Sequence, residues 1–217
     1  MKKDFSVTDL HHEVLRFWAA WRREHDFMPS VLTLDHHTDV VQAFRNDSIV
    51  VPEGAWRSEE CVERAVAELK HDEHFDWAVR SGLIKEAFIA SHTNATAPAN
   101  GALHICMDPR WGEENDLFRE PERLRPLADS VLESDYLYRC FGDIEKYGRF
   151  ILDIDCDYFL TVKALSPQDD SYFRMLCQKA EIITVSLEKD WVRLLRFRGE
   201  EFSAERIVQS IAVFAAD

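Results

Sequence analysis

LDHHTD at residues 34–39 and LDIDCDYF at residues 152–159 decide the fold of this 217-residue chain. Each stretch continues an apolar run typical of a β-strand, VLTL at 31–34 and FIL at 150–152, and then changes to acids and histidines. A buried carboxylate without a compensating cation costs several kcal/mol or takes up a proton. In an open α/β sheet, ligands bind at the carboxyl ends of the strands. The two stretches therefore predict buried strands that end together at a metal centre.

The composition suits one folded domain over residues 1–217, because 46% of the chain is hydrophobic. We expect no membrane partner, since no apolar run approaches the roughly 18 residues of a membrane span, and residues 1–13 lack the apolar core of a signal peptide. The five scattered cysteines contain no CxxC pair, which favours a reduced cytoplasmic protein. The formal charge of −14 argues against a nucleic-acid partner and is compatible with a cationic substrate. The oligomeric state stays open.

Apolar strand-like runs alternate with helical patterns along the chain, which indicates an α/β fold. The runs are continuous rather than alternating, as in a mostly parallel sheet that helices cover on both faces. Residues 108–126, with three prolines, predict mostly loop and one short helix. The expected strands are 3–8, 31–35, 86–91, 101–107, 149–155 and 181–187, and the expected helices are 12–25, 58–71, 74–81, 167–180 and 203–215.

The two acid-rich strand ends contain a set of side chains that suits a hard divalent ion. If strand geometry persists, side chains alternate in direction, so Asp35, His37 and Asp39 share one side. The same alternation aligns Asp153, Asp155 and Asp157, although we expect the chain to turn before Asp157. Many carboxylates and few imidazoles favour Mn²⁺ over a structural zinc ion. More than four ligands indicate two ions with bridging carboxylates. The alternative is that each acid caps a helix or pairs with a surface cation.

Other histidines complete the inventory. His11 and His12, ahead of an amphipathic helix, are a further source of a ligand, although a solvated helix start is an alternative. His92, at the end of the run EAFIAS, and His104 are candidates for proton transfer, with His104 more typical of a core residue. His71 and His74 flank two acids, which favours a solvated helix end. Trp18 and Trp21, at helical spacing, are expected in the core.

HHEVL at 11–15, LDHHTD and LDIDCDYF together resemble the signatures of the arginase superfamily of ureohydrolases. They are most similar to the short arginase-like family that includes the peptide arginases, which hydrolyse arginine side chains within peptides to ornithine. The resemblance implies a three-layer αβα sandwich and two Mn²⁺ ions per chain. The chain lacks the long N-terminal half and the GGDHS motif of full-length arginases. Matched position by position, the implied metal ligands are Asp35, His37, Asp39, Asp153, Asp155 and one of His11 and His12, with His12 favoured.

The resemblance also implies a reaction and a substrate, an arginine-containing peptide. A hydroxide that bridges the two ions would attack the guanidinium carbon. Asp39 or His92 would transfer protons, and Glu188, after the run IITVSL, would hold the guanidinium cation. The products would be urea and an ornithine side chain.

Three rival functions remain at this point. The DHH phosphoesterases share the triplet Asp35-His36-His37, but in that family an Asp-x-Asp element precedes the triplet, and no basic cluster for phosphate is evident here. A deacetylase-like amidohydrolase with one metal would leave Asp39 and Asp155 without a clear role. A non-catalytic protein stabilised by a closed metal site is the third. The metal content per chain would distinguish these functions. Two manganese ions would support the arginase-like function, one zinc ion a deacetylase-like site, and no metal a purely structural role of the acids.

Overall fold

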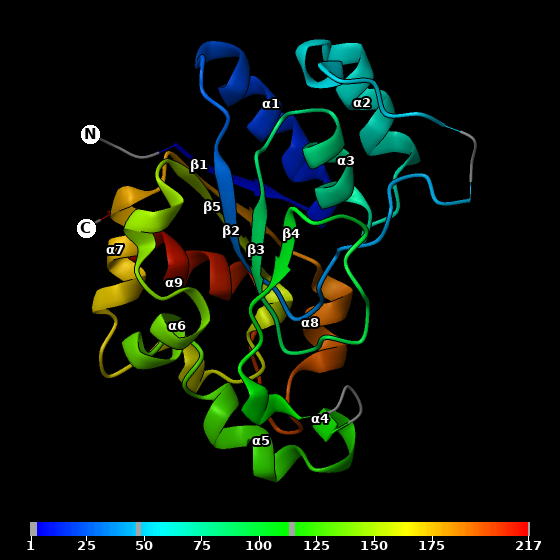
Figure 1. The fold of residues 1–217 in the computed structure, drawn as a ribbon. Coiled ribbons are helices and arrows are strands. Elements are labelled where there is room, and N and C mark those ends of the chain that lie inside the picture. Colours follow the sequence, from blue (N-terminus) through cyan, green and yellow to red (C-terminus); the bar gives the residue numbers. More distant parts are fainter. Residues whose placement is uncertain (1–3, 47–48, 113–115, 217) are drawn as a thin grey trace.

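The central feature of the computed structural model, which describes residues 4–46, 49–112 and 116–216, is a six-stranded sheet. Its strand order is β1-β6-β5-β2-β3-β4, and every neighbouring pair is parallel. Figure 1 shows how the strands lie side by side. Lys3, the first residue of the expected strand 3–8, lies outside the described residues. The strands are β1 (Asp4–Thr8), β2 (Ser30–Leu34), β3 (Ala87–Ala90), β4 (Leu103–Ile105), β5 (Phe150–Asp155) and β6 (Ile182–Ser186).

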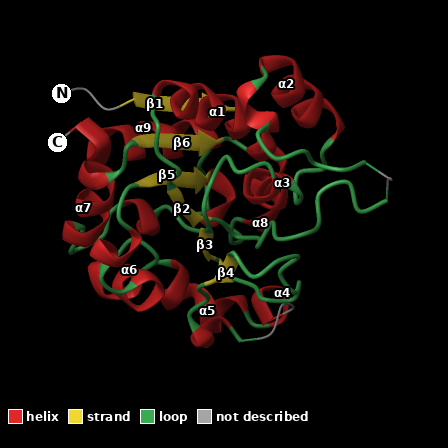
Figure 2. Cartoon of the chain, turned by 45° about the horizontal axis from the view of Figure 1, so that its top comes forward, coloured by secondary structure: helices red, strands yellow, loops and turns green. Residues whose placement is uncertain are grey.

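Helices pack on both faces of this sheet and enclose two separate cores. Val31 and Ile151 face the core on one side, whereas Leu32 and Leu152 face the core on the other, as alternation along a strand requires. This arrangement confirms the predicted three-layer αβα sandwich (Figure 2). One face packs against α1 (Leu15–Glu24), α2 (Glu59–Glu68) and α3 (His74–Arg80), and the other against α4 (Asp116–Arg119), α5 (Pro121–Ala128), α6 (Ser134–Phe141), α7 (Ser171–Lys179), α8 (Lys189–Leu195) and α9 (Ala204–Ala216).

The predicted strands and most predicted helices are present, with shifted ends. Ser58 caps α2, where its hydroxyl accepts the N–H of Cys61 at 3.3 Å. The helix expected from residue 167 begins instead at Ser171, and the sequence did not predict α6 or α8. Trp18 and Trp21 are buried, as expected. His104 is not a core residue, because β4 is an edge strand and leaves that side chain 40% exposed.

The order of connections reverses between β2 and β5, the two central strands. From β2 the chain continues outward to β3 and β4, whereas from β5 it continues in the opposite direction to β6. Such a reversal opens a crevice at the carboxyl ends of the strands, where open α/β sheets bind their ligands. Figure 2 shows α3 and α8 on the side to which the strand arrows point.

Among the described residues, no helix has the length and apolar character that crossing a membrane requires.

Candidate metal centre

The two acid-rich segments meet at the reversal between β2 and β5. The strands pair in parallel with Leu34 beside Ile154, so Asp35 and Asp155 follow at the same level of the sheet edge. The N–H of Asp35 donates to the Ala90 carbonyl at 3.2 Å, which extends the pairing with β3 by one residue. Both carboxylates are buried. The adjacent strand ends thus bring together acids that are more than a hundred residues apart in the sequence.

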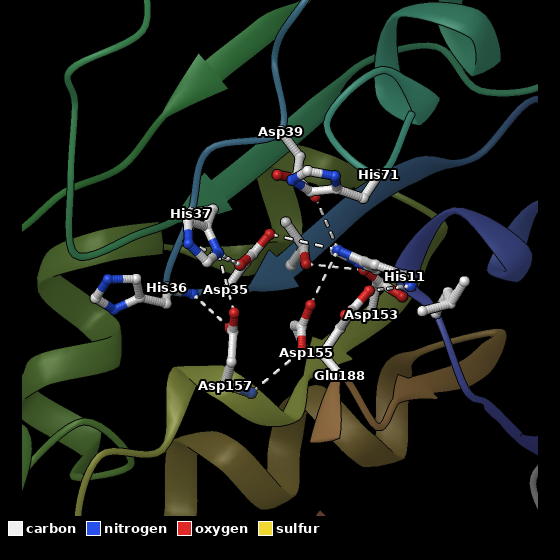
Figure 3. A network of polar contacts seen from close by, with 12 residues as sticks. His11, Asp35, His36, His37, Asp39, His71, Asp153, Asp155, Asp157 and Glu188 are labelled. Atoms are coloured by element: carbon white, nitrogen blue, oxygen red, sulfur yellow. Dashed lines mark hydrogen bonds and ion pairs between the residues drawn. The ribbon is translucent and has the colours of Figure 1, made fainter. Parts of the chain in front are cut away.

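His11 lies in the middle of these acids (Figure 3). It belongs to a short 3₁₀ helix, His11–Val14, that precedes α1. Its Nδ1 is 3.1 Å from Asp39 Oδ2, 3.4 Å from Asp35 Oδ2 and 3.3 Å from Asp155 Oδ2. The imidazole is 1% exposed. The Nδ1 edge of the His11 ring therefore meets three carboxylates from two segments of the chain, the one after β2 and the end of β5.

Asp153 contacts the opposite edge of the same ring. The Nε2–H of His11 donates to Asp153 Oδ2 at 2.7 Å. The hydroxyls of Thr33 and Thr184 donate to the two oxygens of Asp153 at 2.9 and 2.6 Å, and the Thr184 hydroxyl in turn accepts the indole N–H of Trp18 at 3.1 Å. Asp153 thus accepts three hydrogen bonds and orients the ring of His11, as carboxylates behind metal-binding histidines do. Asp153 belongs to none of the candidate ligand groups among the described residues, so its predicted metal contact stays a prediction.

Asp157 occupies the place in the cluster of candidate ligands that the sequence analysis gave to Asp153. β5 ends at Asp155, and the chain turns into a 3₁₀ helix, Cys156–Tyr158, in which the N–H of Asp157 donates to Asp155 Oδ1 at 3.1 Å. The turn directs the fully buried Asp157 carboxylate to His37, whose Nδ1 is 3.0 Å from Asp157 Oδ2. The N–H of His37 donates to Asp35 Oδ1 at 2.8 Å. Asp157 is therefore a member of the cluster that position-by-position matching left out.

These residues form candidate ligand groups that share Asp35. His11, Asp35 and Asp155 make one group, and Asp35, His37 and Asp157 make another. Asp35 Oδ2 and Asp157 Oδ2 are buried and accept no hydrogen bond, although both lie within ion-pair range of a histidine. Buried carboxylate oxygens without a donor are costly, and divalent cations satisfy them. The donor set therefore fits a metal ion.

The titration behaviour of the cluster shows how much positive charge it requires. Burial disfavours the charged ring of His11, but the carboxylates of Asp153, Asp35 and Asp39 outweigh burial and raise its pKa well above the ordinary value. His37 behaves in the same way beside Asp157, with its pKa raised to about 9. Burial and the neighbouring charge of Asp39 raise the pKa of Asp35. The raised pKa values of both histidines and of Asp35 share one cause, an excess of buried carboxylates, which a bound cation would also relieve.

Five predicted site residues lie outside the two groups: Asp39, which forms a third possible group with His11 and His74, and Asp153, His12, His92 and Glu188. His12 is buried, but its Nδ1 has no hydrogen-bond partner and it forms no ion pair with the described acids, so the structure favours His11 over His12 as the ligand. His92 is stacked between Trp111 and Tyr158, with its Nδ1 3.2 Å from the Nδ1 of His36. Figure 3 shows the His36 ring directed away from the carboxylates, so His92 reaches the cluster only through His36.

Glu188 is buried beside the cluster rather than exposed on a loop. It has a positive φ of 37° directly before α8. Its Oε1 accepts the backbone N–H of His11 at 2.8 Å, and burial raises its pKa. Glu188 therefore fixes the segment that carries the central histidine.

Residues 73–76, at the start of α3, support the cluster, which the sequence did not predict. His74, expected to be solvated, is fully buried, with its ring 4.4 Å from that of His11 and its Nδ1 3.9 Å from Asp39 Oδ2. Two buried acids of the same segment, Glu73 and Asp76, accept backbone N–H groups of Phe44 and Ala43. They hold the loop on which Asp39 (φ 48°) adopts a left-handed conformation.

Replacing Asp76 with Ala should loosen this loop. The variant leaves the N–H of Ala43 and the side-chain amide of Asn100 without the acceptors that now lie at 2.8 and 2.7 Å. We expect the free energy of unfolding to fall by about 3 kcal/mol, measured by urea denaturation of metal-free protein. Glu68→Gln, which alters an exposed acid of α2, is the control, with a change within about 0.5 kcal/mol. An equal effect of the two variants would contradict the role of Asp76.

A cavity opens from solvent onto one side of the cluster. It has a volume of about 130 Å³ and is lined by His37, Thr38, Asp39, Val41, His71, Asp72, Thr93, Ala95 and Thr96. A larger cavity of about 550 Å³ between α8 and α9 includes Glu188 but no member of the candidate ligand groups. We call the smaller one the entrance cavity, because it reaches His37 and Asp39.

Comparison of the chain with protein-family models and with curated proteins finds no match in either set.

Proposed function

We propose that this chain is a manganese-dependent hydrolase of guanidinium groups that converts arginine residues of peptides to ornithine with release of urea. One observation carries the proposal: two candidate ligand groups share Asp35 at the reversal of the sheet. A shared carboxylate is the feature that distinguishes a centre for two ions from two separate sites. The resemblance of the motifs to arginase-like enzymes supplies the substrate class.

We assign the candidate ligands to two metal positions. His11, Asp35, Asp39 and Asp155 would hold one ion, and Asp35, His37 and Asp157 the other. Each of the four carboxylates lies within 3.4 Å of an imidazole nitrogen of His11 or His37. Four carboxylates and two imidazoles suit Mn²⁺. Ions held by these residues would supply an activated water molecule and stabilise developing negative charge.

The chain's own groups account for binding and proton transfer. Glu188 uses Oε1 for the N–H of His11, which leaves Oε2 to accept a hydrogen bond from a guanidinium. Asp39 lines the entrance cavity and is the carboxylate of the cluster that meets an incoming substrate, so we assign proton transfer to Asp39. His92 lies behind His36 and does not line that cavity, which argues against the same role for it.

The charge of the entrance favours a cationic substrate over an anionic one. Two aspartates and two histidines line the cavity, and its described lining contains no lysine or arginine. Phosphate recognition depends on clustered cations and helix N-termini, so this lining disfavours the phosphoesterase alternative. The shared Asp35 disfavours a deacetylase-like centre with a single ion.

The substrate test uses manganese-loaded protein, arginine-containing peptides and mass spectrometry. We expect each arginine peptide to lose the mass of cyanamide, which is urea minus water, while lysine and citrulline peptides stay unchanged because neither presents a planar cation. Glu188→Gln should retain both ions and lose about tenfold or more in kcat/KM, because a charge-assisted hydrogen bond exceeds a neutral one by about 1–2 kcal/mol. Turnover of acetyl-lysine or a phosphodiester, without change in any arginine peptide or free arginine, would refute the proposal.

A further inference from the structure

The wall of the entrance cavity opposite the metal centre carries an acid that the chemistry described above does not use. His37 and Asp39 form the side toward the cluster, and Asp72 lies on the segment that precedes α3. Glu188 lines the other, larger cavity. A substrate that enters by the entrance cavity therefore meets Asp72, and not Glu188, on its way to the cluster.

Asp72 is held in place by its backbone, and its side chain is left poorly paired. The Asp72 carbonyl accepts the N–H of Val41 at 3.1 Å, so the loop that carries Asp39 fixes its position. Its Oδ1 is buried and accepts no hydrogen bond, and its Oδ2 is 4.0 Å from Nη2 of Arg45, the outer limit of an ion pair. The side chain as a whole is 25% exposed. A desolvated carboxylate oxygen without a donor is destabilising, so the fold gains nothing from this charge that an amide would not give.

The aromatic groups around the entrance also suit a cation. The ring of Trp191, in the first turn of α8, lies 4.9 Å from that of His37 and 6.4 Å from that of His71. Trp191 thus contacts two histidines that line the cavity. In Figure 3 His71 lies beside Asp39. Indole faces attract guanidinium and ammonium groups by about 0.5–2 kcal/mol.

We propose that Asp72 is a specificity-determining residue whose partly exposed carboxylate receives the guanidinium of the substrate at the entrance. This inference rests on the proposed function and adds a second carboxylate to it. Asp72 would govern capture of the cation, whereas Glu188, next to His11, would act on the guanidinium at the cluster. Loss of Asp72 should therefore raise KM, and loss of Glu188 should lower kcat.

The test compares wild type, Asp72→Asn and the control Glu68→Gln, each loaded with Mn²⁺, by isothermal titration calorimetry. The probes are N-acetyl-arginine amide and the neutral N-acetyl-citrulline amide. We expect Asp72→Asn to bind the arginine probe about tenfold more weakly and the citrulline probe unchanged, because only the charged contact is lost. Its metal content should equal that of wild type. With an arginine peptide, KM should rise about tenfold while kcat stays within about twofold.

The outcomes separate this inference from the proposed function. Equal affinity of wild type and Asp72→Asn for the arginine probe overturns the role of Asp72, whether or not arginine is hydrolysed. No binding of the arginine probe to wild type also overturns it. If wild type hydrolyses no guanidinium compound but Asp72→Asn still loses affinity for the cationic probe alone, the cation site stands and the proposed reaction fails.

Discussion

Asp35→Asn is expected to release both metal ions while the protein stays folded. Asp35 is the member common to the two candidate ligand groups, and an amide offers only a neutral carbonyl oxygen to each ion. The loss of affinity should exceed the roughly 10- to 100-fold that changes behind the ligands cause. Elemental analysis after dialysis against Mn²⁺ measures the effect directly, and circular dichroism checks the fold.

A graded series makes this expectation specific. Asp157→Asn should lose one ion and retain the other, because Asp157 belongs to the group of His37 alone. Asp153→Asn should keep both sites with affinity weakened about 10- to 100-fold, because Asp153 acts by orienting His11. If Asp153→Asn instead empties the centre while Asp157→Asn leaves both ions bound, the assignment from the sequence is right and that from the structure is wrong.

The strands, but not their order in the sheet, were accessible from the sequence because buried strands of a parallel sheet are continuous apolar runs. FILDID and EIITVSL are such runs, and both form interior strands, β5 and β6. The helices α6 and α8 were not predicted. Their patterns are short, eight and seven residues, and periodicity is weak evidence over two turns.

The members of the metal centre were predicted better than their roles. Asp153 and Asp157 both lie two residues from Asp155, so alternation alone cannot tell which of them faces the cluster and which faces Thr184 on β6. The choice depends on where β5 ends, and a strand end is a tertiary property. The 3₁₀ helix Cys156–Tyr158 turns Asp157 to the cluster.

His74 was expected to be solvated, and His11 was ranked below His12 as a ligand, for a related reason. Both lie at polar-looking helix starts, where solvation is the common outcome. Burial of His74 depends on Trp18 and Phe75 from the core of one face, and the position of His11 depends on Glu188 from the far end of the chain. Contacts across 177 positions leave no local pattern in the sequence. A polar run such as HDEH at 71–74 is therefore predicted to lie on the surface, although two of its members, Glu73 and His74, are buried.

The free energy of unfolding of the metal-free protein should fall as the pH rises from 6 to 9, by about 3 kcal/mol or more. The pKa of His37 is raised to about 9 in the folded state, so its stabilising charge is fully present below its ordinary pKa of 6.5 and is lost as the pH approaches 9. Protonated His11, whose pKa is also raised, acts in the same direction. Asp35 adds to the trend because its pKa is raised in the folded protein. In the unfolded chain this acid is already ionised at low pH, so ionising it in the folded protein as the pH rises lowers the free energy of unfolding.

Manganese should reverse this dependence, since metal binding requires deprotonated ligands and strengthens as the pH rises. Urea denaturation at pH 6 and pH 9, with a chelator or with excess Mn²⁺, measures both trends.

The matched variant is Asp35→Asn, which removes a buried acid and the ions together. In chelator at pH 9 it should be more stable than wild type, although it is the less stable protein in Mn²⁺. That crossing has one physical source, a set of buried carboxylates that destabilises the fold until a cation neutralises it. The free energy of unfolding of the metal-free wild type could instead stay level or rise from pH 6 to pH 9. That result would show that the cluster is neutral without metal, and it would remove the electrostatic argument for a metal centre.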